Sequence, residues 1–421
     1  MKINDILKGM DCTCGKKHSC PIEYVYVEKG AISRISDACE SYKNILVVAD
    51  ENTFAAAGNK VLSNLGDKCV KTVIFSGKTV LIPDERAIEK VNENIDGIDC
   101  LVGIGSGVIQ DLCKYVSFFS KIPYIIVATA PSMDGYASDG AAMILKGMKE
   151  TVKAGLPKAI IADVDVLKNA PLEMIKAGYG DIIGKYSALC DWKLSRVVNG
   201  EYFCDYIYNT TYSMIEETKA NAKGIISRED EAIKILAEAL VIVGIMMSFA
   251  TSSRPASGSE HHLSHFFEIV GIVNDEKYLA HGIDVAYSTI VTAEIREKIR
   301  KQEFPDKIYR QERADYEAQI RDIYKSVADE CIALQDRVGN YSADRIGVYK
   351  EKYGEIMDIL SEMPSAKEIE EILGLACLDI SEFYATYPKE KINNAIRYAK
   401  DLKDRYTVLW LYYDLFGGCE K

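Results

Sequence analysis

The chain has 421 residues, enough for two large domains or three smaller ones. Its composition, 48% hydrophobic and 27% charged, is typical of a soluble globular protein. A formal net charge of -12 argues against non-specific binding to nucleic acid or to an anionic membrane, but allows a phosphorylated metabolite in a locally basic pocket. The N-terminus lacks the apolar core of a signal peptide, and the most apolar stretch, residues 235–251, is interpreted as a buried helix. We therefore expect a cytoplasmic protein without a membrane span.

Residues 1–21 form a cysteine-rich segment that precedes the first expected domain. Cys12, Cys14, His18 and Cys20 follow the pattern Cys-x-Cys-x3-His-x-Cys, whose ligand types could hold a structural zinc ion. The spacing is tighter than in the usual two-knuckle zinc sites, so a flexible, reduced tail is the alternative. The other cysteines are scattered singly, as expected for reduced thiols that are mostly buried as small apolar residues.

Residues 22–162 alternate between short β-branched runs and helical stretches. The expected strands are 23–27, 45–49, 70–75, 100–103, 124–128 and 159–162, and the expected helices include 53–65, 85–94 and 108–119. This alternation predicts a parallel sheet covered on both faces, as in an α/β dinucleotide-binding domain. From residue 163 to 421 the strand signals stop. Long helical periodicities, among them 174–197, 229–251, 311–338 and 406–416, predict an all-helical domain.

A glycine loop, residues 103–107 (Gly-Ile-Gly-Ser-Gly), follows one expected strand and opens the helix at Val108. Glycines let the backbone approach a ligand closely, and a helix N-terminus attracts pyrophosphate. The loop therefore favours nucleotide binding, although a simple glycine turn is common at such positions. Asp50, at the end of an earlier strand, either accepts hydrogen bonds from a ribose or caps the next helix.

A second loop, residues 129–138, leaves the expected strand at 124–128 and is rich in small hydroxyl side chains. We call it the hydroxyl loop. It could contact phosphates and a substrate hydroxyl, and the alternative is an ordinary polar turn.

Four of the five histidines lie between residues 261 and 281. His261 and His265 are spaced i, i+4, so on a helix they share one face. Imidazole is the commonest ligand for transition metals, and the concentration of histidines favours a metal site over two surface histidines and a core one. A carboxylate is expected to complete it. Asp181, which has glycines at 178, 180 and 184 around it, is the best candidate, and Asp284 is the alternative.

In chain order, these motifs resemble the sn-glycerol-1-phosphate dehydrogenase family, within the glycerol dehydrogenase and iron-containing alcohol dehydrogenase superfamily. The motifs are Gly105 to Asp111, the hydroxyl loop, Gly180-Asp181, Ser257 to His261, and His281-Gly282. The Gly-Ser-Gly loop, the cysteine-rich N-terminus and the extended C-terminal helical region are most similar to the bacterial branch. The resemblance implies a dehydroquinate-synthase-like fold with its active site in the cleft between the domains.

The resemblance also implies a role for each matching residue. Asp181, His261 and His281 would hold the metal, His265 would contact the substrate, and Asp134 would lie on the substrate side of the hydroxyl loop. A nicotinamide cofactor would contact Gly105, Ser106, Gly107, Val108, Ile109, Gln110, Asp111, Thr129, Ser132 and Ser138, and also Asp50 if that carboxylate binds the ribose. The implied metal is zinc or nickel rather than iron, and the cofactor is NAD or NADP.

The implied reaction is the reduction of dihydroxyacetone phosphate to sn-glycerol 1-phosphate by a homodimeric enzyme, and its reverse. Lys158, Lys185 and Arg254 are hypothetical partners for the substrate phosphate. A dehydrogenase acting on glycerol or another polyol would share the metal and cofactor residues. The Ser-Gly-Ser-Glu-His and Pro-Ser-Met-Asp-Gly-Tyr motifs argue against a cyclising lyase similar to dehydroquinate synthase. A metal- or nucleotide-sensing protein with a degenerate site is disfavoured because Asp181, His261 and His281 are all present.

Overall fold

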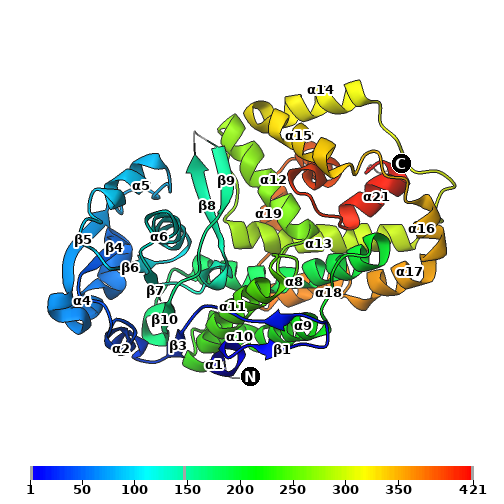
Figure 1. Cartoon of the computed structure of the whole chain (residues 1–421). Coiled ribbons are helices and arrows are strands. Elements are labelled where there is room, and N and C mark those ends of the chain that lie inside the picture. The colour runs from blue at the N-terminus through cyan, green and yellow to red at the C-terminus, as the bar shows by residue number, and fades with distance from the viewer. Residues whose placement is uncertain (1–2, 146–147, 419–421) are drawn as a thin grey trace. The chain divides into compact units, whose positions relative to one another are not determined.

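The structure is a computed structural model that describes residues 3–145 and 148–418. The chain divides into two compact units (Figure 1). Residues 1–182 and 216–252 form the first unit, and residues 183–215 and 253–421 form the second. Helices near residues 216–252 therefore belong with the N-terminal sheet, although the strand signals in the sequence end well before them.

A six-stranded sheet forms the centre of the first unit, in the order β3-β10-β7-β6-β4-β5. All of its neighbouring strands are parallel. The strands are β3 (Tyr24–Glu28), β4 (Ile45–Asp50), β5 (Cys69–Phe75), β6 (Cys100–Gly105), β7 (Tyr124–Ala128) and β10 (Ala159–Asp163). Each expected strand is confirmed to within two residues at either end. Strands β6, β7 and β10 are buried along their whole length, which explains why they are continuous apolar runs rather than alternating ones.

The order of the strands places the two sequence-predicted nucleotide elements next to each other. Strand β4 continues to β5 on one side, whereas its other neighbour, β6, continues to β7 on the opposite side, so the connections leave β4 and β6 in opposite directions. In open parallel sheets, ligands bind at the carboxyl ends of strands at such a reversal. Asp50 ends β4, and the glycine loop ends β6.

Helices and two small hairpins complete the first unit. The helices are α1 (Ile3–Leu7), α2 (Ile35–Ala38), α3 (Glu51–Thr53), α4 (Asn59–Leu65), α5 (Glu85–Asn92), α6 (Gly107–Ser120), α7 (Val164–Leu167), α10 (Ala222–Ile226), α11 (Asp230–Ala250) and the first part of α8 (Leu172–Asn199). The hairpins are β1 (Met10–Asp11) with β2 (Lys17–His18), and β8 (Gly140–Leu145) with β9 (Met148–Lys153). The single helix expected at 53–65 is in fact α3, a π-helical turn at Phe54–Gly58, and α4.

Helix α11 is the apolar stretch that the sequence predicts to be a buried helix. Of the described helices, it alone is long and apolar enough to cross a membrane, but 78% of its most apolar window is buried inside the protein. It packs on the hydroxyl loop, where a Cβ added at Gly244 would lie 2.8 Å from the Asp134 carbonyl oxygen. This burial confirms the prediction of a buried helix, and α11 covers the loop that follows β7.

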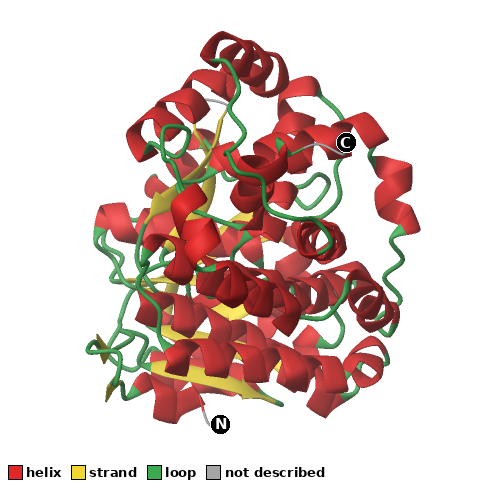
Figure 2. Ribbon diagram, turned by 90° about the vertical axis from the view of Figure 1, so that its right-hand side faces the viewer, coloured by secondary structure: helices red, strands yellow, loops and turns green. Residues whose placement is uncertain are grey.

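Helices make up most of the ordered elements (Figure 2), and every helix or strand in the described part of the second unit is a helix. Besides the rest of α8, its helices are α9 (Asp205–Ala220, whose last turn belongs to the first unit), α12 (Ser259–Asn274), α13 (His281–Arg300), α14 (Arg313–Tyr324), α15 (Ala328–Val338), α16 (Ile346–Glu351), α17 (Tyr353–Glu362), α18 (Ala366–Gly374), α19 (Ser381–Thr386), α20 (Lys389–Tyr398) and α21 (Val408–Phe416). The prediction of one long helix over 311–338 is wrong. Lys325 adopts a left-handed φ of 47°, which separates α14 from α15.

Candidate functional site

The second unit brings three of the predicted histidines together at the start of two packed helices. The ring centroids of His261 on α12 and His281 on α13 are 5.2 Å apart. His265, one turn after His261, lies 5.5 Å from His281 and 6.3 Å from His261. Each of His261 and His281 offers a ring nitrogen, and the two lie within 4.8 Å of each other. This histidine cluster can therefore supply two nitrogen ligands to one metal ion.

A buried carboxylate orients the first of these rings. Glu260 Oε1 lies 2.6 Å from His261 Nδ1 and also accepts a hydrogen bond from the Gly258 N–H at 2.9 Å. A carboxylate on Nδ1 favours the tautomer with its proton there, which leaves the Nε2 lone pair for a metal. Ser264 Oγ lies 3.3 Å from His281 Nδ1 and plays a similar part for the second ring.

Two residues that sequence reasoning missed hold the beginning of α12 in place. Asp191, on α8, accepts hydrogen bonds from the N–H of Ser259 at 2.6 Å and of Val408 at 2.7 Å. Burial, with the nearby Glu260 charge, raises the pKa of Asp191 to about 6. Arg405 donates to the Ser257 carbonyl oxygen at 3.0 Å. Neither residue lies in a recognisable motif, so only tertiary packing reveals them.

Replacing Glu260 by glutamine is expected to weaken metal binding about 10-fold to 100-fold, the usual cost of losing an outer-shell carboxylate. The fold should persist, because glutamine keeps the shape of the side chain. Competition between the protein and a chelator would measure the affinity. Glu276→Gln, at an exposed pair with Lys391, is the matched control and should leave it unchanged. Equal affinities for E260Q and wild type would remove the orienting role.

His262 is separated from the cluster by its position on α12. Successive helical residues point about 100° apart, from 3.6 residues per turn. The His262 side chain is fully buried, and neither of its ring nitrogens has a hydrogen-bond partner among the described residues. This burial lowers the pKa of His262 well below its usual value, so the ring is neutral. Its environment is that of a core side chain.

Asp181 lies on α8 in the first unit, where the hydroxyl loop holds its carboxylate. Asp181 Oδ2 accepts a hydrogen bond from the Asp134 N–H at 3.0 Å. The helix and the loop touch through their backbones, since a Cβ added at Gly178 would lie 1.8 Å from the Pro131 carbonyl oxygen. The alternative carboxylate, Asp284, is bound elsewhere in the second unit: both of its oxygens accept from Tyr387 Oη at 2.9 Å, and burial raises its pKa.

The glycine loop and the hydroxyl loop are neighbours because β6 and β7 are paired. Gly105 is in register with Ala128, and the Thr129 N–H donates to the Gly105 carbonyl oxygen at 3.1 Å. Helix α6 begins at Gly107, where an added Cβ would meet no protein atom within 4 Å. The N-terminus of α6 is therefore open to an anionic group, such as a pyrophosphate.

Side chains inside α6 support the hydroxyl loop. Gln110 Nε2 donates to the Tyr136 carbonyl oxygen at 3.2 Å, and Lys114 Nζ donates to the carbonyl oxygens of Gly135 at 3.2 Å and Gly140 at 2.6 Å. Lys114 is fully buried and was missed in the sequence. Since Ile109 and Gln110 are buried too, their side chains face the protein interior. The resemblance assigns both residues to the cofactor, but in the structure Gln110 supports the hydroxyl loop and Ile109 packs against the glycine loop at Gly105.

The remaining predicted cofactor residues lie along the two loops. Asp50 caps α3, where its Oδ1 accepts from the N–H groups of Asn52 at 2.8 Å and Thr53 at 2.9 Å. The sequence predicts that Asp50 either accepts from a ribose or caps the next helix, and the structure contains the helix cap. Ser138 Oγ donates to the Gly135 carbonyl oxygen at 3.1 Å. The half-buried residues among the other predicted cofactor contacts are Ser106, Gly107, Val108, Asp111 and Ser132.

Two of the three cations considered for a substrate phosphate are paired with carboxylates. Arg254 forms a partly buried ion pair with Glu201 at 2.5 Å, and Lys158 forms an exposed one with Glu23 at 2.7 Å. Lys185, one turn after Asp181 on α8, is fully buried. A phosphate role therefore fits Arg254 and Lys158 poorly, because each already balances a negative charge.

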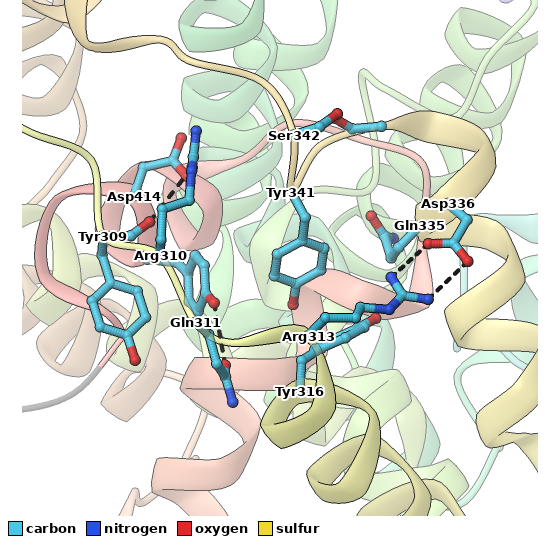
Figure 3. A pocket seen from close by; sticks show the side chains of 12 residues that line it. Tyr309, Arg310, Gln311, Arg313, Tyr316, Gln335, Asp336, Tyr341, Ser342 and Asp414 are labelled. Carbon is cyan, nitrogen blue, oxygen red and sulfur yellow. Dashed lines mark hydrogen bonds and ion pairs between the residues drawn. The ribbon is translucent and has the colours of Figure 1, made fainter.

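A pocket of about 270 Å³ in the second unit lies among α14, α15 and α21 (Figure 3). Tyr309, Arg313, Tyr341 and Tyr413 are among its lining side chains, and none of the predicted site residues lines it. Arg313 is bound to Asp336 at 2.6 Å, so its charge is balanced within the pocket wall. The pocket thus has no part in the histidine cluster.

Gly107→Ala is expected to raise the KM of the nicotinamide cofactor about 10-fold or more, equivalent to about 1.4 kcal/mol of binding. The added methyl group would occupy the space above the helix N-terminus that a pyrophosphate needs. The thermal midpoint should be unchanged, because the methyl meets no protein atom. Gly347→Ala, at an equally open glycine on α16, is the control. An unchanged KM in G107A would argue against cofactor binding at this loop.

Comparison with known proteins places the chain among dehydrogenases. The iron-containing alcohol dehydrogenase family matches residues 26–171. A glycerol-1-phosphate dehydrogenase [NAD(P)+] of Bacillus licheniformis is 30% identical over 407 residues, which cover 94% of this chain and 90% of that protein. The enzyme of the same name from Geobacillus thermodenitrificans is 33% identical over 303 residues, covering 70% and 75%.

The fold is that of the iron-containing alcohol dehydrogenases. The structure of one such enzyme from Thermococcus thioreducens matches 96% of this chain and 100% of its own, with a TM-score of 0.60 and 14% identity. The expected two-domain architecture, a parallel sheet followed by a helical part, is thereby confirmed. Together with the identity over nearly the whole length to the Bacillus licheniformis protein, this shows that the chain belongs to the glycerol-1-phosphate dehydrogenase family.

Proposed function

We propose that this protein is an NAD(P)-dependent enzyme that interconverts dihydroxyacetone phosphate and sn-glycerol 1-phosphate. The observation that carries the proposal is the pair of ring nitrogens from His261 and His281, with Glu260 orienting the first ring. Relatives with this enzyme name match the chain over most of its length. We propose dihydroxyacetone phosphate as the ketone substrate and the sn-1 configuration at carbon 2 of the glycerol phosphate product.

The proposed metal ligands are Asp181, His261 and His281. Helix α8 runs unbroken from Leu172 to Asn199, and Asp181 lies in the part of it that belongs to the first unit. Three residues later, a Cβ added at Gly184 would lie 3.4 Å from Glu260 Cγ, next to His261. Two imidazoles and one carboxylate suit zinc, nickel or iron and leave positions for substrate oxygens. The resemblance favours zinc or nickel.

When bound, the metal ion would polarise the substrate carbonyl and stabilise the alkoxide that forms as hydride arrives. The protein's own contribution is to hold the ligands and the substrate in one geometry. The Asp134 N–H fixes the Asp181 carboxylate, while Glu260 and Ser264 set the orientation of the histidine rings. His265 would orient a substrate hydroxyl or help to relay a proton, since its ring centroid lies 5.5 Å from that of His281 and 6.3 Å from that of His261.

The cofactor would bind along the glycine and hydroxyl loops, beside the reversal of strand order. The pyrophosphate would lie at the N-terminus of α6, and the side chains of Asp111, Thr129, Ser132 and Ser138 would contact the rest of the dinucleotide. Asp50 has one carboxylate oxygen engaged in the helix cap. If the other accepted from a ribose, the 2′-phosphate of NADP would be repelled, so we propose a preference for NAD.

The test is to follow NADH and NADPH oxidation with dihydroxyacetone phosphate, on protein stripped of metal and then given zinc or nickel. The proposal requires oxidation that depends on the metal, with dihydroxyacetone a far poorer substrate. Oxidation with unphosphorylated ketones alone would make the protein a polyol dehydrogenase. Binding of metal and NAD without oxidation of any ketone would instead indicate a lyase or a sensor. We further propose that the protein is a cytoplasmic homodimer. Light scattering of the purified protein would check the dimer, and fractionation of cells would check the location.

A further inference from the structure

The cysteine-rich N-terminal segment forms an ordered hairpin outside the machinery described above. We call residues 10–18 the cysteine hairpin. Strand β1 pairs with β2 in antiparallel register, Met10 opposite His18. The Cys12 N–H donates to the Lys16 carbonyl oxygen at 3.1 Å, and the Gly15 N–H donates to the Cys12 carbonyl oxygen at 3.0 Å. Gly15 has φ = +85°, a conformation that favours glycine, so the turn is tightly defined.

This turn gathers three potential metal ligands from one short segment. One ligand atom from each of Cys12, Cys14 and His18 lies within 4.8 Å of the other two. Cys14 Sγ is 3.5 Å from His18 Nε2. The His18 side chain is only 1% exposed and stacks on Phe249 of α11, with ring centroids 5.1 Å apart and planes at 8°. The imidazole is therefore fixed in place beside both thiols.

We propose that Cys12, Cys14 and His18 bind a structural zinc ion that closes the cysteine hairpin onto α11. Two thiolates and an imidazole are the ligand types of structural zinc sites, and soft sulfur ligands select zinc over magnesium, calcium or manganese. They fill three positions of a tetrahedral shell, and the fourth takes a water molecule or a further thiol. This site is distinct from the proposed catalytic centre, which contains no cysteine.

Cys20, the last residue of the sequence pattern, is not part of this group. Its thiol is buried and interacts with Ser248 and the Ile22 backbone, and burial raises the pKa of that thiol. Cys20 is thus a matched control within the same segment.

The site has a structural rationale. A hairpin with two residues in each strand has little stability of its own. Metal binding adds free energy only when the ligands are gathered, and so it stabilises the folded hairpin. The ion would hold the N-terminus against α11 through the stacked pair of His18 and Phe249.

Cobalt substitution of the full-length protein tests the proposal. Cobalt bound to thiolates gives a strong charge-transfer absorption in the near ultraviolet, whereas a site of two imidazoles and one carboxylate gives none. Wild type, Cys20→Ser and His281→Ala should show this band. Cys12→Ser and Cys14→Ser should lose it, and as zinc proteins they should each contain one metal ion fewer per chain. Absence of the band in wild type, or its survival in both serine variants, would overturn the proposal.

Thiol labelling of the wild-type protein provides a second measurement that needs no variant to fold. Zinc should slow the alkylation of Cys12 and Cys14 at least about tenfold, as located by peptide mass analysis, and a chelator should restore the rate. The half-buried thiol of Cys69, far along the chain, should react equally in both states. Equal labelling of Cys12 and Cys14 with and without zinc would contradict the site.

Discussion

Replacing His281 with alanine is expected to lower kcat/KM for dihydroxyacetone phosphate about a thousandfold, with loss of the bound metal. A metal ion that stabilises a developing alkoxide supplies several kcal/mol, and about 4 kcal/mol corresponds to roughly a thousandfold. The fold should survive, because His281 is half-buried at the first position of α13 and the helix does not depend on its side chain. Metal analysis and steady-state kinetics on the same preparation measure both effects.

His262→Leu is the matched control for this variant. His262 lies on the same helix as His261, but it is buried, neutral and without a hydrogen-bond partner among the described residues. An apolar side chain of similar size should be tolerated there, since an unsatisfied buried polar group is itself unfavourable. H262L should keep its metal. If H281A retained both metal and activity, the assignment of His281 would be wrong.

Gly178→Ala is expected to be the most destabilising small substitution in the first unit, at about 3 kcal/mol or more. The new Cβ would lie 1.8 Å from the Pro131 carbonyl oxygen and 2.8 Å from its carbonyl carbon. Both are backbone atoms of the hydroxyl loop, so α8 or the loop must move. Such a shift would also break the bond from the Asp134 N–H to Asp181. Urea unfolding should show a lower free energy of unfolding, and cofactor titration should show a lower affinity for the cofactor.

Gly354→Ala gives the opposite expectation for the same chemical change. Gly354 is exposed on α17, and an added Cβ would meet no atom within 4 Å. Alanine is favoured over glycine within helices by about 1 kcal/mol, so this variant should be as stable as wild type or more so. Equal stability of G178A and G354A would show that α8 and the hydroxyl loop are less tightly packed than the structure indicates.

The strands could be predicted because each is a short apolar run in a repeating βα pattern. The β8–β9 hairpin could not, since residues 140–153 include two glycines, two alanines and three lysines, residue types with little β-propensity. The break in the single helix expected over 311–338 could not be predicted either. The hydrophobic period continues across Lys325, and only the backbone conformation there reveals the break. Local patterns identify elements well but not interruptions of a few residues.

The histidine cluster was predictable because histidine is rare in this chain and its spacing matches one helical face. The residues that hold the cluster were not. Asp191 and Arg405 meet the segment before α12 from far along the chain, and Lys114 binds loop carbonyls that its own helix does not contain. Buried polar groups require partners, but a sequence alone does not say which partners they have.

The identity of the product tests the central claim most directly. The enzyme, loaded with zinc or nickel, would convert dihydroxyacetone phosphate and NADH to glycerol phosphate, and the product would be given to a dehydrogenase specific for sn-glycerol 3-phosphate. The proposal predicts that this second enzyme leaves the product unchanged, because hydride arrives on the face that produces the 1-phosphate. Complete oxidation by the second enzyme would show the opposite stereochemistry and would contradict the proposed function.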